Sequence, residues 1–196
     1  MTADPASVDE VAEAIRRRSA GRRRCLVGIS GFGGAGKSTL ARALLERLPD
    51  ATRVRGDDFL DPPRVFSRSD DWAGVDRVRL REEVLDPYRH GRDVVMRRYD
   101  WSAGRLGEPE PLPEARILLV DLIGLLHPDL DGCFDLTVWV DTDLATATQR
   151  GKARDRALGN DHDRVWDEIW APNELDFERR FHPRQAADLR FAPPVE

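Results

Sequence analysis

A glycine-rich segment carries the most specific chemical signal in the sequence. It reads Gly31-Phe32-Gly33-Gly34-Ala35-Gly36-Lys37-Ser38-Thr39 and matches the phosphate-binding pattern G-x-x-x-x-G-K-[ST] in full. Glycines let backbone N–H groups converge on an anion that larger side chains would block. An apolar run precedes the segment and a helical pattern follows it, which is the context that separates such a site from a chance match. We expect this segment to bind the phosphates of ATP.

Lys37 and Ser38 complete the expected nucleotide site. Lys37 is one of only two lysines among 31 basic residues, so a lysine stands here although arginine is used almost everywhere else. Its compact ammonium group can reach the β- and γ-phosphates inside the loop, where the planar fork of arginine would not fit. The Ser38 hydroxyl is a suitable ligand for Mg²⁺. These residues predict ATP and Mg²⁺ as cofactors.

Acidic residues that follow strand-like segments are the candidates for catalysis and for holding the metal. A carboxylate at Asp57 or Asp58 could orient an acceptor hydroxyl and take its proton during phosphoryl transfer. The residues alone leave open whether Asp57 or Asp58 is the base, and a helix cap or an acidic turn is the structural alternative for both. Asp121 ends an apolar run and is the candidate to hold Mg²⁺, directly or through water. Asp141 has a similar place, but the residues after it favour a helix cap.

A basic cluster late in the chain could close over the phosphates. It contains Arg150 and Arg154, and cationic side chains on a lid stabilise the charge that develops during phosphoryl transfer. We expect the lid at residues 150–162. Arg150 and Arg154 would bind ATP there, and Arg154 would act in catalysis together with Lys37 and the base, Asp57 or Asp58. A solvated helix face in an arginine-rich protein is the structural alternative.

Aromatic and polar residues in the middle of the chain could frame a pocket for the acceptor. The expected acceptor-binding set is Asp57, Asp58, Trp72, Tyr99 and Arg105. Trp101, Trp166 and Trp170 could add further aromatic walls, although a single aromatic side chain is more often part of a core or of a half-buried surface. The four histidines have no metal partner at a useful spacing, and we assign them no role.

The order of apolar runs and helical patterns predicts how these residues are brought together. Strand patterns lie at residues 25–30, 52–55, 94–96, 117–121, 136–141 and 187–191, and helical patterns at residues 8–18, 38–48, 75–88, 144–156 and 163–181, the last broken or started near Pro172. Residues 61–71 are polar and rich in turn formers, which indicates a surface loop. Strands that alternate with helices predict an α/β fold of three layers, with a mostly parallel sheet of about five strands and helices on both faces. Ligands bind at the carboxyl ends of the strands in such sheets.

Length and composition limit the classes of function. The 196 residues, 40% apolar and 34% charged, predict one globular domain spanning residues 1–196. A net charge of −5 provides no basic field for nucleic acid or for an anionic membrane, so we expect a small diffusible substrate instead. We also expect neither a secretory signal nor a membrane span. Cys25 and Cys133 have no metal-ligand spacing and are interpreted as reduced thiols of a cytoplasmic protein. A homo-oligomer is compatible with the sequence, which determines no oligomeric state.

The order of the motifs resembles the uridine kinase-like branch of the P-loop kinases, which includes phosphoribulokinase and bacterial pantothenate kinase. The resemblance covers nearly the whole chain, and the phosphate loop is its most specific part. The later segments are Asp57-Asp58-Phe59, Tyr99-Asp100-Trp101, Val120-Asp121, Arg154-Asp155, Trp170 with Glu174, and Ala187-Asp188. The resemblance implies an ATP-dependent kinase with Asp57 as the base, Tyr99 beside the acceptor and Arg154 on the phosphates.

The chain departs from this family at positions that read the acceptor. Uridine kinases usually carry a histidine a few residues after the Tyr-Asp pair, and residues 102–105 contain none. The nearest match to their ribose-contacting arginine after the lid is Asn160, and their Glu-Gly after the third strand is Asp121-Leu122 here. The acceptor is therefore open between a nucleoside and another alcohol, such as a sugar, a vitamin precursor or a specialised metabolite.

A nucleotide-dependent switch or ATPase acting on a protein partner is the competing class. The chain lacks the Asn-Lys-x-Asp motif that reads guanine and the Leu-Ser-Gly-Gly signature of transporter ATPases. A switch would also have no need for Asp57 beside the γ-phosphate together with an aromatic pocket. ATP turnover that rises only when a small alcohol is added would separate the two classes.

Overall fold

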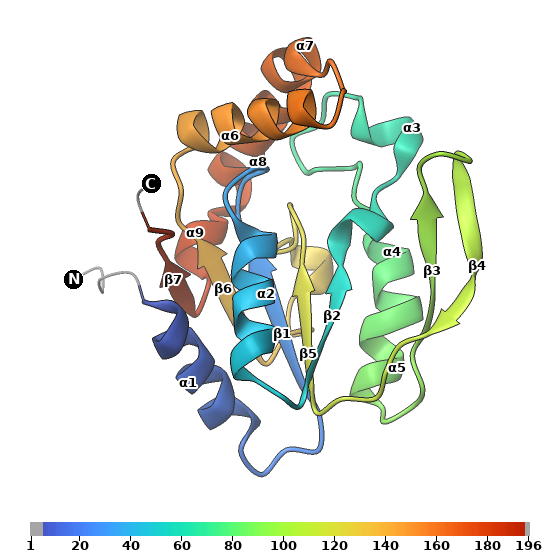
Figure 1. Ribbon diagram of the computed structural model, residues 1–196, viewed down its shortest axis with the longest axis vertical. Coiled ribbons are helices and arrows are strands. Elements are labelled where there is room, and N and C mark those ends of the chain that lie inside the picture. The colour runs from blue at the N-terminus through green and yellow to red at the C-terminus, as the bar shows by residue number, and fades with distance from the viewer. Residues whose placement is uncertain (1–5, 195–196) are drawn as a thin grey trace.

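A parallel sheet forms the centre of the molecule in the computed structural model, which describes residues 6–194 (Figure 1). Its strand order is β2-β5-β1-β6-β7, and the strands are β1 (Cys25–Ser30), β2 (Ala51–Arg55), β5 (Ile117–Asp121), β6 (Leu136–Val140) and β7 (Leu189–Phe191). Ile29 of β1 and Arg55 of β2 both lie opposite Asp121 of β5. The carboxyl ends of these three strands therefore meet at one edge of the sheet, and β7 is an edge strand as predicted.

Helices lie on both sides of the sheet (Figure 1). They are α1 (Val8–Ser19), α2 (Lys37–Arg47), α3 (Pro62–Val65), α4 (Arg77–Leu80), α5 (Asp86–Arg89), α6 (Leu144–Ala157), α7 (Asp163–Val165), α8 (Ala171–Phe181) and α9 (Pro183–Ala186). Short 3₁₀ turns cover Gly56–Phe59 and Pro128–Leu130. None of the helices within residues 6–194 combines the length and the apolar character that crossing a membrane requires.

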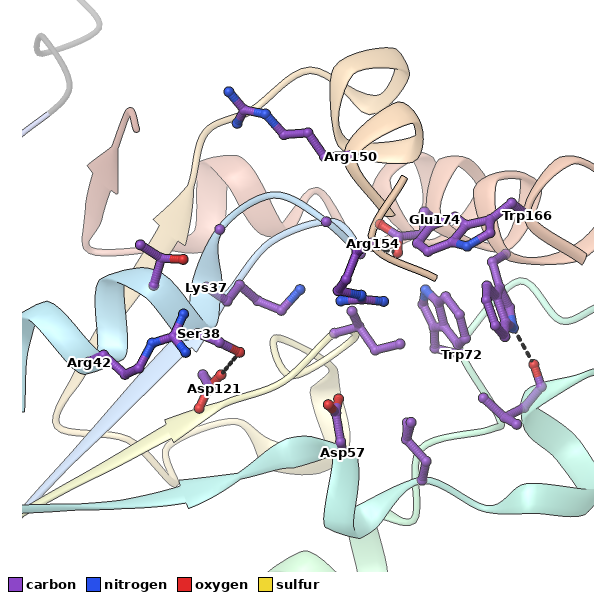
Figure 2. A pocket seen from close by; sticks show the side chains of 18 residues that line it. Lys37, Ser38, Arg42, Asp57, Trp72, Asp121, Arg150, Arg154, Trp166 and Glu174 are labelled. Atoms are coloured by element: carbon purple, nitrogen blue, oxygen red, sulfur yellow. Dashed lines mark hydrogen bonds between the residues drawn. The ribbon is translucent and has the colours of Figure 1, made fainter. Parts of the chain in front are cut away.

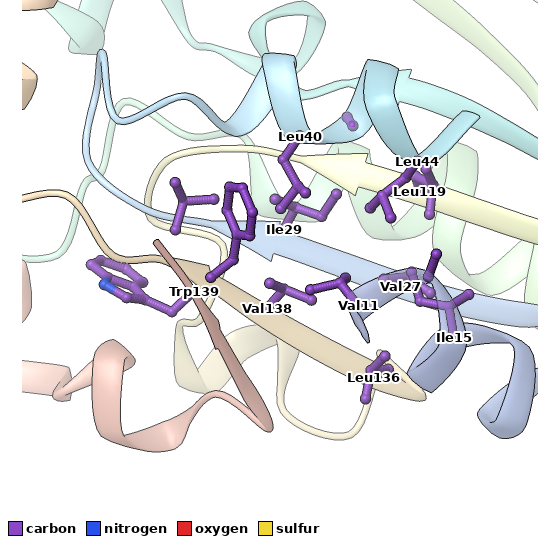
Figure 3. Packing of buried hydrophobic residues seen from close by; sticks show 14 of the residues in the cluster. Val11, Ile15, Val27, Ile29, Leu40, Leu44, Leu119, Leu136, Val138 and Trp139 are labelled. Atoms are coloured by element: carbon purple, nitrogen blue, oxygen red, sulfur yellow. The ribbon is translucent and has the colours of Figure 1, made fainter. Parts of the chain in front are cut away.

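Two hydrophobic clusters flank the sheet because successive side chains of a strand point to opposite faces. Val27 and Ile29 of β1 pack with α1 and α2 in the cluster that Figure 3 shows. Leu26, the residue before Val27, packs on the other face with Tyr88 of α5 and Phe177 of α8. The α/β fold of three layers, with a five-stranded central sheet, is confirmed.

A π-helical turn resolves the break that the sequence predicts near Pro172. The turn spans Trp166–Trp170, and the N–H of Ala171 donates to the carbonyl oxygen of Trp166, five residues earlier. Proline has no N–H group for the normal helical bond, and a widened turn accommodates it without ending the helix. The helix therefore continues into α8. The turn Arg81–Leu85 joins α4 to α5 in the same way.

The connection between α5 and β5 forms an antiparallel hairpin that the sequence pattern conceals. β3 (Val95–Asp100) pairs with β4 (Arg105–Pro111) outside the main sheet. Glycine and proline in β4 suggest an irregular connection, yet proline is tolerated in an edge strand because its missing N–H faces solvent. The expectation of a surface loop at residues 61–71 is also wrong in part, since α3 lies within it.

Candidate active site

A cavity of about 370 Å³ lies at the carboxyl ends of the central strands (Figure 2). The loop after β1, the helix α6, the turn after β2 and the segment from Trp166 to Glu174 form its walls. Its lining residues are Gly33, Gly34, Gly36, Lys37, Ser38, Thr39, Arg42, Asp57, Leu60, Val65, Trp72, Asp121, Ile123, Arg150, Arg154, Trp166, Trp170 and Glu174. The fold thus brings into one space most of the residues predicted for the nucleotide, the metal, the base and the lid.

The loop between β1 and α2 has the shape of an anion cradle. Gly34 adopts a φ of +80°, and a Cβ atom on it would lie 2.1 Å from the carbonyl oxygen of Ala147 on α6. Only glycine fits this conformation and this close approach. The first turn of α2, which begins at Lys37, lines the cavity with N–H groups that have no partner within the helix. The backbone therefore fits a polyphosphate.

Lys37 lies against the inside of this loop. Its Nζ donates hydrogen bonds of 2.8 Å to the carbonyl oxygens of Gly31 and Phe32. Burial lowers the pKa of Lys37, the negative charge of Glu174 opposes that change, and nearby Arg154 lowers the pKa further. A second cation close enough to lower the pKa of Lys37 suits a site that receives a polyanion.

Ser38 and Asp121 form the candidate metal site. Ser38 Oγ donates to Asp121 Oδ2 at 2.8 Å, and Arg53 of β2 donates to both carboxylate oxygens of Asp121. A hydroxyl and a carboxylate are oxygen ligands of the kind that Mg²⁺ prefers, so these residues fit the ion. The part of the chain that the structure describes contains no cluster of three or more His, Cys, Asp or Glu residues that could hold a metal. Phosphate oxygens and water would therefore have to complete the coordination.

Asp57 faces the cavity, whereas its neighbour Asp58 does not. Both belong to the 3₁₀ turn Gly56–Phe59 that follows β2, and consecutive residues of a tight turn point in different directions. The side chain of Asp57 is 65% exposed and lies 3.8 Å from Arg55, and Figure 2 shows it pointing into the cavity. Asp58 is buried, and burial raises its pKa. Asp58 does not line this cavity, and its expected contact with the acceptor stays a prediction.

Glu174 of α8 brings a buried carboxylate to the phosphate loop. One of its oxygens accepts a hydrogen bond of 2.6 Å from the backbone N–H of Gly33. Burial raises the pKa of Glu174 to about 7, although the charge of Lys37 and the Gly33 N–H both favour the ionised form. The motif order included Glu174 but gave it no role, and no local pattern around it indicates contact with a loop 141 residues away.

The predicted lid corresponds to the second half of α6 and the turn after it. Arg154 lines the cavity beside Lys37, and its guanidinium also donates to Asp155 Oδ1 at 3.1 and 3.2 Å. Asp155 is buried and accepts a 2.9 Å hydrogen bond from Trp166 Nε1, which ties the lid to the aromatic wall. Arg150 lines the cavity too, but Figure 2 shows its guanidinium directed away from Lys37.

Several predicted site residues lie elsewhere. Tyr99 and Arg105 are on the hairpin β3–β4 and do not line the cavity, because the antiparallel register places Tyr99 opposite Leu106 and packs its ring against Trp101 at 4.8 Å. Phe32 is buried against Trp139. Gly31 and Ala35 contribute carbonyl oxygens that accept from other residues of the fold.

The acidic residues after β6 have structural partners. Asp143 is the N-cap of α6 and accepts a 2.9 Å hydrogen bond from the N–H of Thr146, as the sequence suggested. Asp141 accepts from Arg184 and Arg190, and it does not line the cavity. The structural interpretation of Asp141 is therefore favoured.

Comparison with known proteins finds two relatives that match part of the chain. The chain is 30% identical over 131 residues to uridine-cytidine kinase C of Dictyostelium discoideum, and 28% identical over 117 residues to inorganic pyrophosphatase TTM2 of Arabidopsis thaliana. These alignments cover 64% and 59% of this chain but only 28% and 17% of the two relatives. No protein-family model matches the chain.

Solved structures show the same fold over almost the whole chain. A possible uridine kinase from Bacillus stearothermophilus has a TM-score of 0.72 with 15% identity, and the match covers 94% of this chain and 96% of that one. The fold is that of the uridine kinase-like P-loop kinases. A proposed fructose transport system kinase from Silicibacter sp. TM1040 gives a TM-score of 0.70 with 20% identity, covering 96% and 100% of the two chains. The resemblance that the motifs indicate is confirmed.

Within this P-loop kinase fold, sequence reasoning missed two kinds of site residue. Arg53 lies in a segment with only a weak strand pattern, which indicates no role for it. It reaches Asp121 only because β2 pairs with β5 in parallel register. Leu60, Val65 and Ile123 have no role in the sequence-based predictions, yet they line the cavity. No pattern within one segment could have separated them from core residues.

Proposed function

We propose that the chain is a kinase that transfers the γ-phosphoryl group of ATP to a hydroxyl group of a small molecule. The observation that supports this most is that Asp57 lines the same cavity as Lys37 and Arg154. A phosphate-binding loop alone occurs in many classes of nucleotide-binding protein and does not specify a reaction. A carboxylate facing that cradle across an open space is what transfer to an alcohol requires.

Each of these residues has a defined part in the reaction. Asp57 orients the acceptor hydroxyl and accepts its proton while the oxygen forms a bond to the γ-phosphorus. The bond from that phosphorus to the bridging oxygen breaks, and the products are ADP and a phosphate monoester. Lys37 and Arg154 stabilise the charge on the transferred group. Mg²⁺, bound by Ser38 with Asp121 behind it, would neutralise charge on the β- and γ-phosphates.

The identity of the acceptor has two candidates within this proposal. One relative is named for uridine and cytidine, and one structural neighbour for fructose transport. A nucleoside and a non-nucleoside alcohol are therefore both compatible with the fold. An ATPase or switch acting on a protein partner is the less favoured alternative, since it gives no task to Asp57.

The test is a transfer assay rather than an ATPase assay. The protein would be incubated with ATP, Mg²⁺ and a panel of nucleosides, sugars, pantothenate-like compounds and aromatic alcohols. ADP release and the mass of each acceptor would be followed together. We expect ADP release to depend on an acceptor that gains one phosphoryl group. Equal ADP release with and without every alcohol, with no phosphorylated product, would point to an ATPase and overturn the proposal.

A further inference from the structure

Charge is distributed unevenly along the cavity. Its cationic side chains, among them Lys37, Arg42 and Arg154, accompany the phosphate loop and the lid. The same cavity has an apolar lining, here called the acceptor wall, which consists of Leu60, Val65, Trp72, Ile123 and Trp170. Figure 2 shows Trp72 on the opposite side of Asp57 from Ser38 and Arg42. Within residues 6–194, the acceptor wall contributes no cation.

The acceptor wall is rigid. Trp170 Nε1 donates a 2.8 Å hydrogen bond to the carbonyl oxygen of Val65, and its ring packs edge-on against Trp166 at 5.0 Å. Trp166 is fixed in turn through Asp155. An apolar surface held in this way is preformed, so a ligand that matches its shape loses little free energy in ordering it.

Trp72 has an unusual conformation at the centre of this wall. It is 2% exposed and adopts a φ of +55°, in the left-handed region that bulky residues rarely enter. Gly124 makes room for it, because a Cβ atom there would lie 2.9 Å from Trp72 Cβ. Strain of this kind persists where the surrounding structure fixes it, and it is frequent at ligand sites.

The polar atoms of the acceptor wall are almost all engaged. The indole N–H groups of Trp166 and Trp170 both have acceptors. Among the described residues, the indole N–H of Trp72 has no hydrogen-bond acceptor. Its nitrogen is also not among the unpaired polar atoms that are completely buried. It is therefore a donor available to a ligand, on a surface that otherwise offers only carbon.

Two classes of acceptor are disfavoured by this surface. A carboxylate or phosphate on the acceptor would face Asp57 and Glu174 with no cation of the acceptor wall to offset the repulsion. A nucleobase would present several donors and acceptors to a wall with a single free N–H, and polar groups left unpaired on burial weaken binding strongly. Arg55 lies near Asp57, but its side chain is 55% exposed and does not line the cavity.

We propose that the acceptor is an uncharged alcohol with a flat apolar body, such as an aromatic alcohol, and that Trp72 is the residue that selects it. This inference rests on the proposed kinase function and chooses among its acceptors. The apolar body would lie against the acceptor wall, and its hydroxyl would point to Asp57.

The test uses three probes that differ in charge and polarity. These are 4-methylbenzyl alcohol, the similarly shaped 4-(hydroxymethyl)benzoate, and uridine. Binding to the full chain in the presence of ADP and Mg²⁺ would be titrated by ligand-observed NMR. We expect 4-methylbenzyl alcohol to bind at least about tenfold more tightly than either of the other two probes.

Three variants connect the result to the acceptor wall. Trp72→Leu should weaken binding of 4-methylbenzyl alcohol about tenfold, while Trp101→Leu, at a 49% exposed position on the hairpin, should leave it unchanged. Should Trp72→Leu fail to fold, as judged by circular dichroism, Ile123→Arg decides instead. It places a cation in the wall at a half-buried position, and it should reverse the preference toward the benzoate probe.

The outcomes separate the two proposals. Uridine or the benzoate binding to the wild-type protein as tightly as 4-methylbenzyl alcohol would overturn the inference. In a second experiment ATP replaces ADP. If uridine or the benzoate is phosphorylated and 4-methylbenzyl alcohol is not, the proposed kinase function holds and the proposed acceptor class is wrong. If 4-methylbenzyl alcohol binds saturably at Trp72 but no alcohol of the full panel is phosphorylated, the acceptor wall is a binding surface and the proposed kinase function is wrong.

Discussion

Arg53 holds Asp121 in a two-point ion pair beside Ser38, its partner in the candidate metal site. Nε of Arg53 lies 2.6 Å from Oδ1 and its Nη2 lies 2.7 Å from Oδ2, and the two side chains are only 14% and 3% exposed. The hydrogen bond with Asp121 raises the pKa of Arg53, so its guanidinium keeps its charge. Because Oδ2 also accepts from Ser38, Asp121 fixes the direction of that hydroxyl.

Removing Arg53 should therefore destabilise the fold. In Arg53→Met the buried carboxylate of Asp121 loses its counter-charge, which costs about 3 kcal/mol in comparable buried pairs. Chemical denaturation would measure the loss in free energy of unfolding. Arg98→Met is the matched control, because its pair with Glu110 is more than half exposed on both sides and such pairs contribute under about 1 kcal/mol. Equal losses in the two variants would contradict this account.

Substitution of the two neighbouring carboxylates after β2, Asp57 and Asp58, should have different effects on kcat. Asp57→Asn should lower kcat by about 10²- to 10⁴-fold, because the acceptor loses its base. ATP affinity, measured by calorimetry, should change little, since Asp57 faces the acceptor. Asp58→Asn should leave kcat nearly unchanged because Asp58 does not line the cavity. If the loss of kcat appears in Asp58→Asn instead, the turn adopts a different orientation with substrate bound.

The sequence predicts those parts of the site that one continuous segment builds. The loop from Gly31 to Thr39 carries its own strand, glycines and helix, so its position at the sheet edge follows from pattern alone. Asp57 and Asp121 could be placed at the same cavity from sequence because each is expected at the end of a strand, and parallel strands end together. Arg53 and Glu174 depend on which strand and helix lie beside them, a property of topology. Tyr99 does not line the cavity because it lies on the hairpin β3–β4, which glycine and proline conceal in the sequence.

Glu174 should make stability depend on pH near neutrality. Burial raises its pKa from 4.5 to about 7 in the folded protein, so between these values the folded state binds more protons than the unfolded state. Stability conferred by this group is present below pH 4.5 and is lost as pH rises toward 7. The loss is of the order of 3 kcal/mol.

Glu174→Gln should remove this dependence, since glutamine keeps an acceptor for the N–H of Gly33 but does not titrate. The free energy of unfolding would be measured at pH 5, 6, 7 and 8. We expect the stability of the variant relative to the wild-type protein to increase as the pH rises. Glu168→Gln, at a position whose side chain is 57% exposed, is the control and should follow the wild-type curve. Parallel curves for wild type and Glu174→Gln would contradict the assignment.

Lys37 and Glu174 should be coupled, because each carries the charge that most favours ionisation of the other. Lys37→Met should abolish tight ATP binding and, at pH 8, also destabilise the fold by leaving the carboxylate of Glu174 without its cation. Adding Glu174→Gln to that variant should restore stability without restoring ATP binding. A double-mutant cycle at pH 8 would then give an interaction of about 1 to 2 kcal/mol, shrinking at pH 5, where Glu174 is protonated. If the changes in free energy of unfolding are strictly additive at both pH values, the charges of Lys37 and Glu174 do not interact across the loop. In that case only the hydrogen bonds to the two carbonyl oxygens hold Lys37 in place.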